Sequence, residues 1–144
     1  MFKGTFYLNI DDSHRLNIPA QLKKYLESDI VISRCLDDKN ETCIYIMNKT
    51  DWDVLENKIN ALPMGNPVVR HIQRHFLGSG YDTNLDPKGR LVVNKELLAF
   101  SNITKECVVL GVGNRIEVWD KDTFLKEPEL TDEELINAYK EFNL

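Results

Sequence analysis

The chain has 144 residues, of which 42% are hydrophobic and 28% charged, and its net charge is −5. This composition is typical of a globular domain and excludes a chain that is disordered throughout. No apolar run approaches the roughly 20 residues of a membrane-spanning helix, and the three cysteines form no CxxC pair, so we expect buried free thiols rather than disulfides or a zinc site.

The first predicted elements are a strand, a turn, a second strand and a short helix. Residues 2–10 alternate polar and apolar side chains, which is typical of a half-buried strand. Asp11–His14 has turn composition, residues 15–18 alternate again, and Pro19 suits the beginning of a short helix. A strand, a polar turn and another strand are then predicted at residues 30–32, 37–41 and 44–47.

A shift of 75 positions reproduces this pattern in the second half of the chain. The residues that recur unchanged are Asn9, Asp11, Arg15, Leu16 and Leu22, as Asn84, Asp86, Arg90, Leu91 and Leu97. An internal duplication explains this better than chance. The elements expected in the second copy are strands at 81–85, 90–93, 108–110 and 116–119, and a short helix at 97–100.

Helical segments join and follow the two copies. Trp52, Leu55, Ile59 and Leu62 predict a helix that ends at Pro63. Pro67 is expected to open a second helix, with Val68, Val69, Ile72 and Phe76 on one side. We therefore divide the chain into a first repeat with its following helix (1–62), a helical linker (63–80) and a second repeat with a C-terminal helix (81–144).

The C-terminal helix carries most of the negative charge. Residues 120–144 have a net charge of −5, whereas residues 1–26 and 60–95 are mildly basic, with net charges of +2 and +3. Thr131 and Glu134 form a predicted capping box, and the acidic first turn complements the helix dipole. This acidic segment is therefore predicted to be a helix rather than a solvated string.

Two turns of the form D-x-x-x-R carry the candidate chemistry. Asp86–Gly89 has the sequence of a type I turn, whose aspartate can accept backbone N–H groups. In the first copy Ser13 and His14 replace its last two residues, and histidine tolerates positive φ better than most residues. Arg15 and Arg90 follow the turns, and a guanidinium suits phosphates and guanine edges. The alternative is a hairpin with an intraloop salt bridge, but the recurrence favours a function.

These turns, the Leu-x-Ile-Pro and Leu-x-Val that follow them, and the helical insert resemble the MraZ family of bacterial transcriptional regulators, over essentially the whole chain. This family is linked to the division and cell-wall gene cluster. The resemblance implies a mixed α/β, β-rich fold, with two swapped-hairpin AbrB/MazE-like repeats forming a small split β-barrel and helices outside. It also implies a ring-shaped homo-oligomer that binds double-stranded DNA at short direct repeats upstream of its own operon.

The resemblance also implies roles for single residues. The residues expected to contact DNA are Arg15, Arg90, Lys88, His14 and Ser13, and those expected to shape the loops are Asp11, Asp86 and Gly89. The acidic helix should lie away from the DNA. We expect a cytoplasmic, nucleoid-associated protein without catalytic activity, cofactor, metal or small-molecule substrate, and the N-terminus has no signal-peptide core.

The sequence allows three other interpretations. His71 and His75 are four residues apart on a predicted helix but lack the glutamate of a zincin motif, so a basic helix face explains them better. Asp11, Asp12 and His14 have no accompanying nucleophile or phosphate-binding loop, which disfavours an enzyme. An antitoxin-like or scaffold interaction module stays open, because the same fold serves antitoxins. Repression or activation, the subunit number and the bases read do not follow from the sequence.

Overall fold

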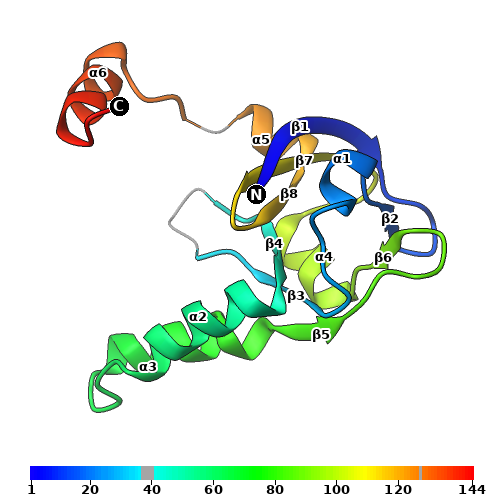
Figure 1. Cartoon of the computed structure of the whole chain (residues 1–144), viewed down its shortest axis with the longest axis horizontal. Coiled ribbons are helices and arrows are strands. Elements are labelled where there is room, and N and C mark those ends of the chain that lie inside the picture. Colours follow the sequence, from blue (N-terminus) through cyan, green and yellow to red (C-terminus); the bar gives the residue numbers. More distant parts are fainter. Residues whose placement is uncertain (37–40, 127) are drawn as a thin grey trace.

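The structure is a computed structural model that describes residues 1–36, 41–126 and 128–144 (Figure 1). The elements from the first copy to the linker are β1 (Phe2–Asn9), β2 (Arg15–Asn17), α1 (Ala20–Lys23), β3 (Ile30–Arg34), β4 (Ile44–Asn48), α2 (Lys49–Asn60), α3 (Pro67–His75) and the 3-10 helix η1 (Leu77–Ser79). The later elements are β5 (Tyr81–Thr83), β6 (Arg90–Val92), α4 (Lys95–Ser101), β7 (Glu106–Gly113), β8 (Ile116–Asp120), α5 (Lys121–Leu125) and α6 (Asp132–Glu141). The polar turn predicted at 37–41 lies, except for Glu41, outside the described residues.

The two repeats exchange strands. The large sheet has the order β1-β7-β8-β4-β3-β5, so the first strand of each repeat pairs with a strand of the other repeat. β1 is antiparallel to β7, from Phe2 opposite Gly113 to Asn9 opposite Glu106, and β5 is antiparallel to β3. A second, two-stranded sheet joins β2 to β6, with Leu16 opposite Leu91. Neither repeat therefore has a complete sheet without the other.

The large sheet is open at both ends. β1 and β5 are its end strands, and no ladder joins them within the described parts of the chain. β5 has only three paired residues, and β2 and β6 form a separate ladder instead of extending the large sheet. The mixed α/β, strand-rich fold is thus confirmed, whereas the small split β-barrel of swapped hairpins is not, since no closed barrel is seen. The boundaries 1–62, 63–80 and 81–144 stay a prediction.

Two hydrophobic clusters hold the elements together. The larger contains Leu16, Leu22, Leu91 and Leu97, the four leucines that recur at the 75-residue shift, and all are essentially unexposed. Leu16 and Leu91 directly follow the two arginines of the D-x-x-x-R turns. Burying one such side chain is worth about 1.5–3 kcal/mol, so each turn is fixed to the core one residue away.

Helices α2 and α3 form a hairpin that projects from the body (Figure 1). Trp52 of α2 packs on Phe76, with ring centroids 4.9 Å apart, and both are buried. Val69 of α3 is buried as expected, but the prediction for Val68 is wrong, because this side chain is 65% exposed. Successive helical residues differ by about 100°, so Val68 faces outward when Val69 and Phe76 face inward.

Other expectations concern the thiols, the tail and the membrane. Cys35, Cys43 and Cys107 are free and buried, as predicted. Helix α6 begins at the predicted capping box of Thr131 and Glu134. Across the described residues, no helix has the length and apolar character needed to cross a bilayer.

Candidate nucleic-acid interface

The first D-x-x-x-R turn, loop 1 (Asp11–Arg15), is organised by the carboxylate of Asp11. Its Oδ1 atom accepts hydrogen bonds from the backbone N–H groups of Ser13 and Arg15, each at 2.9 Å. Its Oδ2 atom accepts a bond from Nε of Arg15 at 2.8 Å. The backbone N–H of His14 also donates to the carbonyl of Asp11, which closes the turn. One side chain therefore fixes both the backbone and the arginine.

Loop 2 (Asp86–Arg90) has the same arrangement. Asp86 Oδ1 accepts from the backbone N–H groups of Lys88 and Arg90, at 2.9 and 2.8 Å, and Oδ2 accepts from Nε of Arg90 at 2.8 Å. The turn is closed by the backbone N–H of Gly89, which donates to the carbonyl of Asp86. The two loops thus present the same fixed geometry despite their different central residues.

The residue before each arginine has a left-handed backbone. The φ angle is 60° at His14 and 76° at Gly89. The carbonyls of these two residues accept hydrogen bonds from the other repeat, because Val93 N–H donates to His14 at 2.9 Å and Ile18 N–H donates to Gly89 at 3.2 Å. The loops are therefore tied to each other and lie side by side at one end of the molecule (Figure 1).

These contacts hold the arginines in place but occupy only part of the hydrogen-bonding capacity of each guanidinium. Each is anchored through Nε alone, and the side chains of Arg15 and Arg90 are 35% and 25% exposed. The described part of the chain shows no further ion pair to either guanidinium. A guanidinium carries five N–H donors, so the two terminal nitrogens can donate to an external group. The intraloop salt bridge and a binding role are thus compatible.

Further cations surround the loops. Lys88 is exposed at the tip of loop 2. Lys23 of α1 covers Gly89, since its Nζ lies 2.6 Å from the position that a Cβ at residue 89 would take. Asp11 and Asp86 are paired with their arginines, and the acidic helix α6 lies on another side of the molecule (Figure 1). With the exposed Asp12 of loop 1 included, the two loops and Lys23 together have a net charge of +1, although the whole chain is acidic.

The hydrogen bonds lower the pKa of both loop aspartates. For each carboxyl the main cause is the backbone N–H of the following arginine, and the arginine side chain adds to it. Donors of this kind favour the charged form. Both carboxylates are therefore ionised at neutral pH.

Acid is expected to weaken the loops. A carboxyl whose pKa is lower in the folded protein stabilises it above the unfolded pKa of about 4 and loses this contribution as the pH falls through the folded pKa. Thermal unfolding measured between pH 6 and 2 should show stability falling below about pH 4. The double variant Asp11→Asn/Asp86→Asn should show a shallower fall. Equal slopes for the two proteins would contradict this account.

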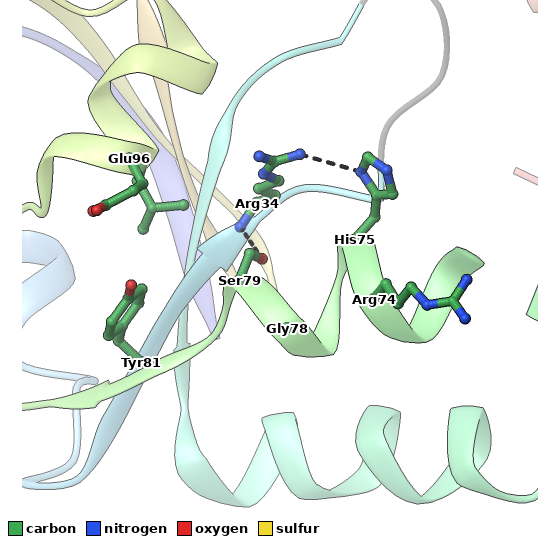
Figure 2. Close-up of a pocket in the computed structure, with 8 residues that line it drawn as sticks. Arg34, Arg74, His75, Gly78, Ser79, Tyr81 and Glu96 are labelled. Carbon is green, nitrogen blue, oxygen red and sulfur yellow. Dashed lines mark hydrogen bonds between the residues drawn. The ribbon is translucent and has the colours of Figure 1, made fainter. Parts of the chain in front are cut away.

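A separate pocket of about 330 Å³ lies between the end of α3, β3 and α4 (Figure 2). Arg34 donates from Nη1 to Nδ1 of His75 at 3.1 Å, and its backbone N–H donates to Oγ of Ser79 at 2.9 Å. Arg74 also lines this pocket, and Figure 2 shows its guanidinium directed away from Arg34 and His75. The rings of His71 and His75 stack at 4.0 Å, and no group of three metal-ligating side chains occurs in the described ranges.

A comparison with protein families bears on the loops. The family described as "MraZ protein, putative antitoxin-like" matches residues 1–75 and again residues 76–140. The chain belongs to the MraZ family. The two matches place one D-x-x-x-R loop in each MraZ repeat, so the duplication seen in the sequence is a property of the domain organisation.

Two features of the MraZ site do not follow from the sequence pattern. The bonds from Val93 to His14 and from Ile18 to Gly89 join residues of different repeats, and only the strand exchange brings them together. The contact between Arg34 and His75 also joins distant segments. Local alternation predicts strands but not their partners, so the sequence contains no signal from which either contact could be predicted.

Proposed function

We propose that this protein is a non-enzymatic, sequence-specific DNA-binding transcriptional regulator that contacts DNA through loops 1 and 2. The observation that carries the proposal is the pair of loops with identical hydrogen-bond geometry, fixed to each other at one end of the molecule. Fixed guanidinium groups suit phosphate oxygens and guanine edges. Arg15 and Arg90 would read DNA, while Lys88, His14 and Ser13 would support them.

The proposal includes self-association and a target. One chain offers two arginine loops, which is few for tight binding, whereas a ring of copies would repeat them and multiply weak contacts. Such a ring would engage short direct repeats spaced about one helical turn. The proposed target lies upstream of the protein's own operon, and the proposed location is the nucleoid; the resemblance to regulators of the division and cell-wall gene cluster supports both parts of the proposal.

The alternative is an antitoxin-like or scaffold module that binds another protein. Two observations support this alternative. The family is described as antitoxin-like, and none of the residues of helix α6 is buried. It differs from the DNA-binding proposal in one measurable respect. A protein-binding module needs no preference for one DNA sequence over another.

The deciding experiment compares binding to the DNA upstream of the protein's gene with binding to a shuffled sequence, across a salt series. The result that supports the proposal is an affinity ratio of about 10³ or more. Equal binding to both sequences that disappears with salt reflects phosphate attraction alone and contradicts specific recognition.

A further inference from the structure

Helix α6 is formed but unpartnered on its apolar side. It begins at a complete capping box, in which Thr131 Oγ1 accepts from the N–H of Glu134, and the Glu134 carboxylate accepts from the N–H of Thr131. No residue of α6 is buried, and Tyr139 and Phe142 are 48% and 66% exposed. Leu135, Tyr139 and Phe142 lie on one side, because residues three and four apart share a helix face.

This combination indicates a partner. Isolated helices of fewer than about 12–15 residues are marginal in water, and most helical stability comes from packing an apolar face. Figure 1 shows α6 standing apart from the body rather than packed on it. The partner must offer apolar area, and it must be basic, because the only basic residue in 127–144 is Lys140, against six acidic residues.

The outer side of α3 has these properties. Arg74 and His71 are exposed along it, and Figure 2 shows the guanidinium of Arg74 directed away from Arg34. His75 is exposed too, but its Nδ1 accepts a hydrogen bond from Arg34. Val68 and Met64 at its beginning are 65% and 70% exposed. Residues 60–80 contain no acidic side chain. No ion pair involves an α3 side chain in the part of the chain that the structure describes.

We propose that α6 of one copy docks on the outer side of α3 of a second copy of this chain. The exposed apolar side chains of α6 would cover Val68 and Met64, and its acidic residues would lie against Arg74 and His71. The charge complementarity between the two surfaces of one sequence is the reason for choosing a second copy as the partner. Within one chain, α6 follows α5, and α5 contacts β7 and β8. Helix α3 contacts α2 and η1 instead, and η1 contacts β3.

This contact is head-to-tail. The two surfaces differ, so a copy that uses its α6 on one neighbour still offers its own α3 to another. Contacts of this type form rings when the rotation closes. The inference rests on the proposed self-association of the chain but not on DNA binding.

The test uses two full-length variants, each defective in one surface. Tyr139→Ser/Phe142→Ser removes the apolar side of α6, and His71→Glu/Arg74→Glu reverses the charge of α3. Control variants are Lys58→Glu/Lys105→Glu, at exposed lysines elsewhere, and Asn137→Ser on the polar side of α6. Light scattering gives the mass of each protein and of a one-to-one mixture, and circular dichroism confirms folding.

We expect the wild type and both controls to form oligomers, and each defective variant to have a subunit dissociation constant at least about tenfold higher. The mixture should form two-chain species, because one intact α6 meets one intact α3. A defective variant with wild-type mass, a mixture that forms no pairs, or a monomeric wild type would overturn the inference. If both defective variants still form oligomers, the chain self-associates through other surfaces and this inference is wrong. The DNA affinity ratio is measured separately on the same samples, so that a failure of this inference is distinguished from a failure of the DNA-binding proposal.

Discussion

Replacing Arg15 or Arg90 with alanine should abolish sequence-specific DNA binding while the protein stays folded. Each arginine offers two terminal guanidinium nitrogens beyond the Nε atom bound to aspartate. A bidentate contact of this kind contributes about 1–3 kcal/mol of discrimination. Because every copy in an assembly loses the contact at once, the affinity ratio between upstream and shuffled DNA should fall from about 10³ towards 1. Binding titrations on the two DNAs measure this ratio.

Two companion variants separate binding from folding. Arg15→Lys keeps the charge but loses the fork and the Nε bond to Asp11, so we expect salt-sensitive binding to remain while discrimination is lost. Lys58→Ala removes one exposed charge far from the loops and should bind as the wild type does. The thermal stability of the arginine variants should change by no more than about 1 kcal/mol, as for partly exposed ion pairs. An alanine variant that keeps the full affinity ratio would show that its arginine does not read DNA.

Gly111→Ala should be among the most destabilising single substitutions in this fold. Gly111 of β7 lies opposite Gly4 of β1, and a Cβ at residue 111 would meet the backbone nitrogen of Lys3 and come within 2.6 Å of the carbonyl carbon of Phe2. Backbone atoms cannot turn aside as a flexible side chain can, so β1 must shift. Overpacking costs about 1–3 kcal/mol and occasionally more. We expect a loss of about 3 kcal/mol, measured by chemical denaturation.

Gly65→Ala is the matched control, because a Cβ at this position has no neighbour within 4 Å. Its free energy of unfolding should stay within about 0.5 kcal/mol of the wild type. Hydrogen exchange should then place the damage of Gly111→Ala in β1 and β7. Loop 1 should loosen with them, since the backbone N–H of Ile10, beside loop 1, donates to the carbonyl of Lys105 at the start of β7. Equal stability of the two variants would contradict the proposed clash.

The sequence predicts the strands of this fold well because their signals are local. Alternation places Phe2 and Ile10 inside, and both are buried. Leu16 and Leu91 recur after 75 residues at equivalent points of the two copies, and both are buried. The type I turn sequence of Asp86–Gly89 likewise predicts the carboxylate bonds of loop 2, since those bonds join residues two and four apart.

The sequence pattern does not show which distant strands pair with each other. Alternation in residues 2–10 shows that a strand exists but not that its partner is β7 rather than β2. The expected barrel is likewise not confirmed: β5 ends at Thr83 instead of continuing to Leu85, and no ladder joins the end strands β1 and β5 among the described residues. Val68 shows a third limit: it is predicted to lie on the same side of the helix as Val69, Ile72 and Phe76, but it is exposed whereas Val69 and Phe76 are buried.

The strand exchange has a consequence for synthesis on the ribosome. β1 leaves the exit tunnel well before its partner β7, whose last residue is Gly113. Contacts between such distant residues form slowly, because a long loop must be closed first. Until β7 is made, both edges of β1 are therefore unpaired and its apolar face, which includes Phe2 and Phe6, is uncovered. These features make incomplete chains prone to aggregation. The other face of β1 has four charged or polar side chains, which help to keep the unpaired strand in solution: Lys3, Thr5, Tyr7 and Asn9.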